Sequence, residues 1–259
     1  MSEWIVGRNP VYEVLRAGRR EVHRLLFAQG VQEKGRLRDI RRLARLRNAE
    51  VEQAPRGQVE RLGEGTQGVA LQTEPYPYSS LPEILERAAL QGEPPFLLLL
   101  DALQDPQNLG SLLRTAEIVG VHGVLLPYRR TATVTPAVVS ASSGASEHLL
   151  IAQANLAQGI DLLKEQGIWV AGLEGDPSSE NEPQAYYPDQ TRLDGPLAIV
   201  VGNEGQGMRK LVRNTCDFLL RLPMRGEIDS LNAAVAGSVA LYLAWQARGY
   251  AGRRAAKSA

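Results

Sequence analysis

Short runs of apolar residues alternate with segments of helical period from residue 96 to residue 249. The apolar runs predict strands at residues 96–103, 121–128, 168–175, 197–204 and 218–224, and the segments of helical period predict helices at 109–120, 135–149, 155–167 and 230–249. Strands that are apolar at nearly every position, separated by helices, are typical of a parallel sheet covered on both faces. We therefore predict an α/β domain over residues 95–250, followed by a basic tail at 251–259.

The first 75 residues predict a smaller α/β domain. Its pattern indicates a helix at 9–18, a strand at 22–29, a helix at 34–49, a short segment at 51–55, a helix at 56–63 and a strand at 67–74. Three prolines within residues 74–82 indicate a linker. A helix near 82–91 and a second proline-rich turn follow, so we place the linker at residues 76–94.

The composition, 44% hydrophobic and 22% charged over 259 residues, is that of an ordinary globular protein. The single cysteine, Cys216, excludes an internal disulfide framework and a cysteine-based zinc site, and we expect it to be a small apolar residue near a strand start. No apolar run reaches the roughly 18 residues that a membrane span needs. The N-terminus lacks the basic start and apolar core of a signal peptide, so we expect a cytoplasmic protein without a membrane partner.

A net charge of zero conceals an asymmetry, because residues 1–75 hold 14 Lys and Arg against 10 Asp and Glu. Most of this excess lies in residues 34–49, where seven basic residues accompany one acid. Apolar residues recur there at helical spacing, which leaves the arginines on the other face. That face is either a solvated helix surface or a contact for a phosphate backbone, and the pattern alone does not decide between them.

Polar residues follow the first strand of the larger domain, at residues 104–117. We expect Asn108 to cap the helix at 109–120. Arg114 and Glu117 are three residues apart, so they either pair on the helix surface or place Arg114 toward a ligand at the sheet edge. A surface pair is the commoner outcome, but the position of Arg114 near the carboxyl edge of a parallel sheet, where ligands bind, weakens that interpretation.

Two further strand-end loops have unusual residues. Gly202, Gly205 and Gly207 are spaced G-x-x-G-x-G, which differs from the G-x-G-x-x-G of a dinucleotide-binding turn and argues against a Rossmann NAD site. In the second loop, Ser230 or Asp229 is expected to cap a helix that starts near Leu231, with Asn232 in its first turn pointing to the same sheet edge.

Other chemistry finds no support in the sequence. The three histidines, His23, His122 and His148, are dispersed and none has a metal-ligand spacing, so we expect structural roles and no metal site. A P-loop, a G-x-S-x-G nucleophile elbow and paired carboxylates are also missing from the sequence.

The three loops together resemble the three motifs of the SpoU-type (TrmH-like) RNA ribose 2′-O-methyltransferases of the SPOUT superfamily. The matching stretches are DPQNLGSLLRTAE, IVVGNEGQGM and LPMRGEIDSLNAAVAGSVAL, and residues 1–75, beginning with IVGRNPVYEVLRAG, are similar to the family's substrate-binding domain. The resemblance implies a SPOUT-type parallel sheet with a C-terminal trefoil knot. It also implies methyl transfer from S-adenosyl-L-methionine (AdoMet) to a ribose 2′-hydroxyl, and within the family it is closest to enzymes acting on a guanosine of 23S rRNA.

By the same resemblance, AdoMet would bind in the knot loops, and the protein would be a homodimer through its catalytic domain. The residues that correspond to the AdoMet-binding positions are Leu173, Gly175, Gly202, Leu222 and Leu231. The catalytic positions are Arg114, Asn108, Glu204, Ser230 and Asn232.

A guanidinium is a poor base at neutral pH, so we expect Arg114 to hold a phosphate and to stabilise the developing alkoxide while the other four residues orient it and the ribose. Two alternatives remain. One is a tRNA ribose methyltransferase of the same family, and the other is a non-catalytic RNA-binding assembly factor.

Overall fold

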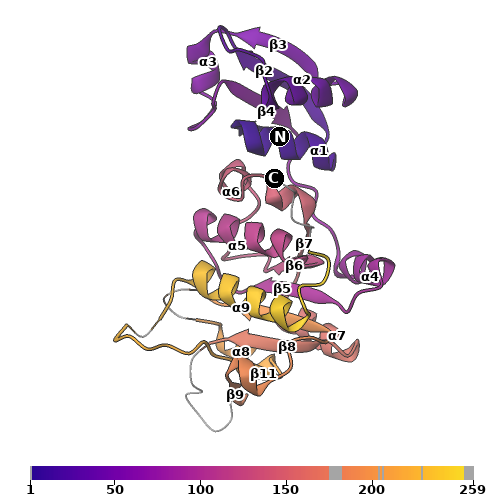
Figure 1. Ribbon diagram of the computed structural model, residues 1–259, viewed down its shortest axis with the longest axis vertical. Helices are drawn as coiled ribbons and strands as arrows, with labels where there is room; N and C mark the ends of the chain where they lie inside the picture. The colour runs from indigo at the N-terminus through magenta and orange to yellow at the C-terminus, as the bar shows by residue number, and fades with distance from the viewer. Residues whose placement is uncertain (1, 175–182, 204, 206, 229, 254–259) are drawn as a thin grey trace.

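Two sheets, each with helices around it, lie one after the other along the long axis of the molecule (Figure 1). The computed structural model describes residues 2–174, 183–203, 205, 207–228 and 230–253. Gly175, Glu204 and Asp229, for which the sequence suggests roles, lie outside the described residues.

The N-terminal sheet has the strand order β1-β4-β2-β3. Its strands are β1 (Glu3–Val6), β2 (Val22–Ala28), β3 (Glu50–Ala54) and β4 (Val69–Thr73), and its helices are α1 (Arg8–Ala17), α2 (Arg36–Leu46) and α3 (Arg56–Glu60). Strands β2 and β3 are parallel, and β4 pairs antiparallel with both β1 and β2. The predicted helices and strands of this part are confirmed within a few residues, whereas β1, only four residues long, was not predicted and the unassigned segment at 51–55 proves to be β3.

The second sheet is parallel throughout, with the order β7-β6-β5-β10-β8-β11-β9. Its strands are β5 (Phe96–Leu100), β6 (Gly123–Leu126), β7 (Leu150–Gln153), β8 (Trp169–Leu173), β9 (Ala185–Tyr186), β10 (Leu197–Val201) and β11 (Phe218–Leu220). The helices are α4 (Leu81–Gln91), α5 (Pro106–Ile118), α6 (Pro136–Ala141), α7 (Leu156–Glu165), α8 (Lys210–Thr215) and α9 (Ala233–Ala247), with the 3₁₀ turns η1 (Ala145–His148) and η2 (Pro188–Gln190). The predicted α/β class and the parallel sheet are confirmed.

Strand β5 shows why the strands of this sheet appear in the sequence as continuous apolar runs. Phe96, Leu98 and Leu100 join a core that contains residues of α5 and α9, whereas Leu97 and Leu99 join a second core with residues of α4 and α7. Successive side chains of a strand point to opposite faces, and here both faces are covered.

The single helix predicted at residues 135–149 is wrong. Helix α6 ends at Ala141, the backbone turns through left-handed φ values of +54° at Ser143 and +85° at Gly144, and η1 follows. Gly144 N donates a hydrogen bond to Val139 O at 2.8 Å, which closes the end of α6. A left-handed residue near a helix C-terminus is a common stop, and glycine adopts it without strain.

Two strands and one helix of the second sheet's domain were not predicted. Strand β7 begins directly after the segment mistaken for a helix, β9 has two residues, and α8 has six. Within the described residues, no helix is long and apolar enough to cross a membrane.

Gly110 is required by the close packing of α5 on α6. A Cβ at this position would lie 2.4 Å from Ala141 Cβ and 2.9 Å from Ser142 N. We predict that Gly110→Ala lowers the free energy of unfolding by about 1–3 kcal/mol through overpacking, although alanine is the better helix former. Urea unfolding measures this effect.

The matched control is Gly57→Ala in α3, where the added methyl group would meet no heavy atom within 4 Å apart from its chain neighbours and the backbone of its own helix. It should leave stability unchanged or raise it by up to about 1 kcal/mol. Equal effects of the two substitutions would contradict this account of Gly110.

Candidate active site

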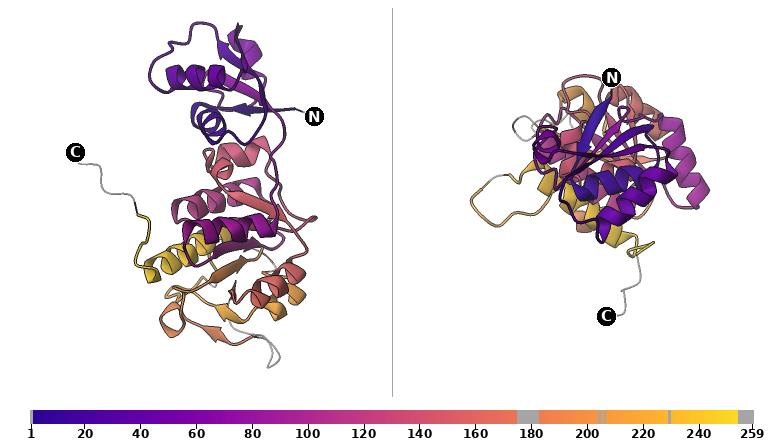
Figure 2. Two further views of the ribbon diagram at one scale, coloured as in Figure 1. Left: turned by 90° about the vertical axis from the view of Figure 1, so that its right-hand side faces the viewer. Right: turned by 90° about the horizontal axis from the view of Figure 1, so that it is seen from above.

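The carboxyl ends of β5, β10 and β8 lie at the same level of the sheet. Val201 pairs with Leu100 on one side and with Leu173 on the other, and Leu220 of β11 also pairs with Leu173. The chain segments that leave these strands therefore meet at one edge although they are far apart in the sequence. The segment between β11 and α9, coloured orange to yellow, projects from this edge (Figures 1 and 2).

A cavity of about 370 Å³ opens among these segments. Four of the five residues expected to bind AdoMet line it, namely Leu173, Gly202, Leu222 and Leu231, and so does Ser230. Gly207 of the glycine motif lines it as well, and the sequence assigned no role to its other lining residues, which are Glu174, Tyr187, Val201, Asn203, Arg221, Met224, Ala233 and Ala236. The lining combines apolar side chains, small residues and a few polar groups, as ligand sites do.

Gly202 allows the loop after β10 to fold tightly. A Cβ on Gly202 would lie 2.3 Å from Gly207 C and 2.4 Å from Met208 N. Asn203 and Gly207 exchange backbone hydrogen bonds, with Asn203 N to Gly207 O at 3.0 Å and Gly207 N to Asn203 O at 2.9 Å. Glycine is therefore required at position 202 because another part of the backbone occupies the side-chain space.

Asp101 ties this loop to the end of β5. Its carboxylate is fully buried and accepts hydrogen bonds from Arg209 N and Arg209 Nε, both at 2.7 Å. Asn203 adds a second tie, because its Nδ2 donates to Ala102 O at 3.1 Å. An acidic residue directly after the apolar run at 96–100 was the feature of the sequence from which the role of Asp101 could have been predicted.

Asn108 and Asn232 come together, but their places in the two helices are the reverse of those expected. Asn108 was expected to be a cap and lies in the first turn, whereas Asn232 was expected in the first turn and is the cap. Helix α5 begins at Pro106 and is capped by Asp105, so Asn108 lies inside its first turn. Proline suits the first helical position, which moves the start toward Asp105. Helix α9 is capped by Asn232 itself, not by Ser230, because Asn232 Oδ1 accepts from Ala234 N at 2.9 Å and from Val235 N at 3.2 Å.

The remaining amide group of Asn232 reaches across to α5. Asn232 Nδ2 donates to Asn108 Oδ1 at 3.2 Å, which links the start of α9 to the start of α5. Two of the predicted catalytic residues are thus brought into contact over 124 positions of sequence.

Arg114 is exposed on α5, and Arg114 Nη1 donates to Ser143 Oγ at 3.4 Å. It is six residues after Asn108, which at 100° per residue places the two on different faces of the helix. The pair with Glu117 does not form among the described residues, and the described residues that line the cavity do not include Arg114. The guanidinium is therefore available to a ligand that approaches from solvent.

Comparison with known protein families gives two matches. The model of the SpoU rRNA Methylase family matches residues 95–242, and the model described as RNA 2′-O ribose methyltransferase substrate binding matches residues 4–79. The chain belongs to the SpoU methylase family.

Relatives and solved structures agree with this placement. A protein of Bacillus subtilis named as the putative TrmH family tRNA/rRNA methyltransferase YacO is 39% identical over 250 residues, covering 95% of this chain and 96% of that protein. The AdoMet-bound rRNA methyltransferase of Sinorhizobium meliloti has the same fold, with a TM-score of 0.76 at 23% identity over 95% of this chain and 87% of that one. The A. aeolicus TrmH/SpoU tRNA modifying enzyme covers 66% of this chain and 81% of its own length, with a TM-score of 0.52 at 23% identity.

This SpoU chain has three further polar residues near the same edge that the sequence analysis missed. Tyr128, Arg129 and Arg130 follow β6 and are all exposed. Thr131 Oγ1 and Ala132 N both donate to Leu103 O, at 3.0 Å and 2.7 Å, which holds this segment beside the loop after β5. An aromatic residue at the end of a predicted strand, followed by two arginines, was the available signal.

The histidines of this SpoU chain have structural contacts. His122 is buried and accepts a hydrogen bond from Phe96 N through Nδ1 at 3.0 Å, and burial lowers the pKa of His122 below its ordinary value. His23 contacts Glu74 and His148 contacts Glu13, both at 2.8 Å. Across the residues that the structure describes, no three His, Cys, Asp or Glu side chains gather as metal ligands.

The buried thiol of Cys216 gives a direct test of its expected structural role. Its Sγ donates to Val212 O at 3.3 Å, and burial raises the pKa of the thiol to about 12. At pH 8 about one thiol in ten thousand would then be ionised. We predict that the folded protein barely reacts with a chromogenic disulfide reagent at pH 8, whereas urea-unfolded protein releases one equivalent per chain. Rapid reaction of the folded protein would show the thiol to be accessible.

Proposed function

We propose that this SpoU-family enzyme transfers a methyl group from AdoMet to the 2′-hydroxyl of a ribose in ribosomal RNA, a guanosine of 23S rRNA, in the cytoplasm. The observation that carries the proposal is the convergence of Leu173, Gly202, Leu222 and Leu231 on one cavity beside the Asn108–Asn232 pair. The N-terminal domain supports ribosomal RNA as the substrate, because the fold match to the S. meliloti rRNA enzyme extends over nearly the whole chain and the match to the A. aeolicus tRNA enzyme does not.

The cavity fits AdoMet. Its volume of about 370 Å³ lies within the range of small-molecule sites. Leu173, Leu222 and Leu231 offer apolar surface to an adenine ring, and the folded loop at Gly202 and Gly207 offers backbone groups to polar atoms. AdoMet would supply the electrophilic methyl group there.

Arg114 would act on the RNA side of the reaction. Its exposed guanidinium lies outside the cavity, on the helix whose first turn carries Asn108. A planar fork of donors suits a phosphate group, and its fixed positive charge stabilises an alkoxide that develops at the ribose oxygen. A guanidinium does not accept the proton, so a phosphate oxygen or water would take it. We propose that Asn108, Asn232, Ser230 and Glu204 orient the ribose.

The N-terminal domain would bind the RNA. Six of the seven basic residues at 34–49 are exposed, while Leu37, Ile40 and Ala44 face the core. Only Arg41 is taken up by a local carboxylate, that of Glu33, among the described contacts of this stretch. This arrangement leaves a dense positive face, which a phosphate backbone would neutralise with release of counterions.

We also propose a homodimer through the catalytic domain. Val235, Val239 and Tyr242 are exposed along α9 and line a groove of about 490 Å³ with residues of α5, among them Asn108. A second copy of the chain would cover these apolar side chains and bring the two sites close to each other.

The first test concerns AdoMet. Gly202→Ala would force the backbone of Gly207 and Met208 away, so we predict that calorimetry detects no AdoMet binding to this variant. The matched control is Gly205→Ala, whose Cβ would lie 3.7 Å from Asn203 Oδ1, an ordinary contact, and it should bind AdoMet as the wild type does. Binding in chelator should occur at about one site per chain. Undiminished binding by folded Gly202→Ala would remove the cavity from the proposal.

The second test concerns the reaction and its target. Ribose methylation mapped across total RNA should show one position that is lost when the gene is deleted and restored by the wild-type gene, but not by Arg114→Ala. A position in 23S rRNA supports the proposal, a position in tRNA replaces the substrate, and no lost position overturns the enzymatic function.

With purified protein, Arg114→Ala should reduce the methylation rate by roughly 100-fold or more, as the loss of one donor to a developing oxyanion does. AdoMet affinity should stay the same, and Arg114→Lys should recover only part of the rate because an ammonium lacks the bidentate fork. Glu117→Ala, one turn along the same helix, is the control and should keep the wild-type rate. A folded Arg114→Ala protein with near wild-type activity would refute the role of Arg114.

A further inference from the structure

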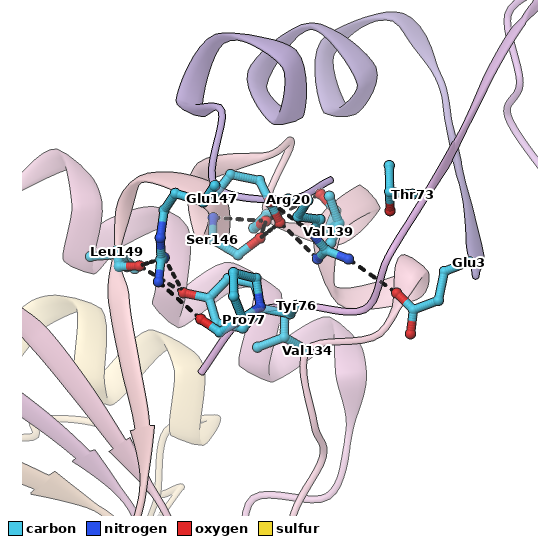
Figure 3. Close-up of polar contacts among 12 residues, drawn as sticks. Glu3, Arg20, Thr73, Tyr76, Pro77, Val134, Val139, Ser146, Glu147 and Leu149 are labelled. Atoms are coloured by element: carbon cyan, nitrogen blue, oxygen red, sulfur yellow. Dashed lines mark hydrogen bonds and ion pairs between the residues drawn. The ribbon is translucent and has the colours of Figure 1, made fainter. Parts of the chain in front are cut away.

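Buried polar contacts join the two domains at one place. The residues after α1 and the linker at 74–79 meet the segment 142–149, which contains η1, and Figure 3 shows these side chains pointing toward one another between the domains. We call this set of contacts the interdomain clamp. It consists of Glu3, Glu13, Arg19, Arg20 and Tyr76 on the N-terminal side and Glu147, His148 and Leu149 on the catalytic side.

Arg20 and Glu147 form the centre of the clamp. Both side chains are fully buried, and the guanidinium binds the carboxylate in bidentate fashion, with Nε to Oε2 and Nη2 to Oε1 both at 2.9 Å. Arg20 Nη1 also donates to Glu3 Oε2 at 3.1 Å and to Glu74 O at 3.3 Å. The guanidinium is therefore bound by residues of both domains at once.

Arg19 and Tyr76 form a second layer on Leu149. Arg19 Nη1 and Tyr76 Oη both donate to Leu149 O, the latter at 2.7 Å, and Arg19 Nη2 donates to Pro77 O at 3.0 Å. Burial raises the pKa of Tyr76 to about 12, so its hydroxyl stays protonated as a donor. At the rim, His148 Nε2 and Glu13 Oε2 lie 2.8 Å apart.

The segment 142–149, which carries the catalytic side of the clamp, also contacts Arg114. Ser143 Oγ accepts the hydrogen bond from Arg114, and Ser143 is four residues before Glu147. At Gly144, a Cβ would lie 2.6 Å from Glu13 Cβ and 3.3 Å from Pro10 Cα, so α1 packs directly on this turn. The segment is thus enclosed between α1 of the RNA-binding domain and α5, which carries Arg114.

A buried ion pair is a poor way to gain stability, because apolar side chains of similar size hold an interface equally well. What two parallel hydrogen bonds add is a fixed angle between the groups that carry them. We propose that Arg20 and Glu147 are positioning residues that fix the orientation of the N-terminal domain on the catalytic domain, so that RNA bound to the first presents its ribose to Arg114 and the cavity. This inference rests on the proposed function.

The test compares Glu147→Gln with the wild type and with Glu52→Gln. The Glu52 variant breaks an Arg–Glu pair with Arg24 that lies wholly inside the N-terminal domain. Spin labels at Gln53→Cys and Gln158→Cys, both exposed and one in each domain, report the distance between the domains when labelled chains are diluted with unlabelled ones. Steady-state methylation of total RNA from the deletion strain supplies kcat and KM, and calorimetry supplies the AdoMet affinity.

In Glu147→Gln we expect the single narrow distance of the wild type to broaden. We also expect kcat to fall about ten-fold or more, because small displacements of reacting groups are costly. KM for RNA should stay within about three-fold, because the RNA-binding surface is intact, and AdoMet affinity should not change. Glu52→Gln should match the wild type in all four measurements. Arg20→Lys keeps the charge but not the fork, so it should show the same pattern more weakly and serves as the second variant if Glu147→Gln does not fold.

A narrow distance in both clamp variants would overturn the proposal, and so would a broadened distance with unchanged kcat, which is what a purely structural pair predicts. The distance measurement needs no methylation activity. If the wild type methylated no RNA, the proposed function would fail while the distances would still decide whether the clamp sets the domain orientation.

Discussion

Parallel pairing in register across β5, β10 and β8 is the constraint on which the site depends. Central strand β10 is hydrogen-bonded on both sides, so the ends of its neighbours at Leu100 and Leu173 are level with Val201. Helices cover both faces of this sheet, and polar side chains can therefore gather only at its edge. The buried carboxylate of Asp101 and the Asn108–Asn232 contact then hold the loops that leave this edge.

Strands β5, β6, β8, β10 and β11 were predictable because two-sided burial leaves a direct trace in the sequence, as the run at 96–100 shows. Helix ends were harder, because several residues near each start could serve as the cap. Helix α5 is capped by Asp105 and not by Asn108, because Pro106 occupies its first position. Helix α9 is capped by Asn232 and not by Ser230, and no local pattern in the sequence predicts this. The glycine spacing argued against a dinucleotide-binding turn but did not reveal why Gly202 is required, because the atoms that exclude a side chain there belong to Gly207 and Met208.

Contacts between the domains were beyond the reach of the sequence. Arg20 and Glu147 are 127 positions apart, and Arg20 looked like one more member of the basic excess of residues 1–75. In the structure, Arg19 donates a hydrogen bond to a backbone carbonyl, and Arg20 and Arg24 each form an ion pair with a glutamate of the same chain. Six of the ten exposed Lys and Arg residues of this domain lie at 34–49, so its positive surface is more local than the count of arginines suggests.

The linker has a part in the sheet as well. Ser79 forms a parallel bridge with Ala152 of β7, and Ser79 N donates to Ile151 O at 2.8 Å. Strand β7 is the last strand on its side of the sheet, and an uncovered edge of this kind invites pairing with other chains. The residues that join the domains therefore also shield a sheet edge. A catalytic domain cut free at residue 95 would lose that shield, and its β7 edge would become a place for aggregation to begin.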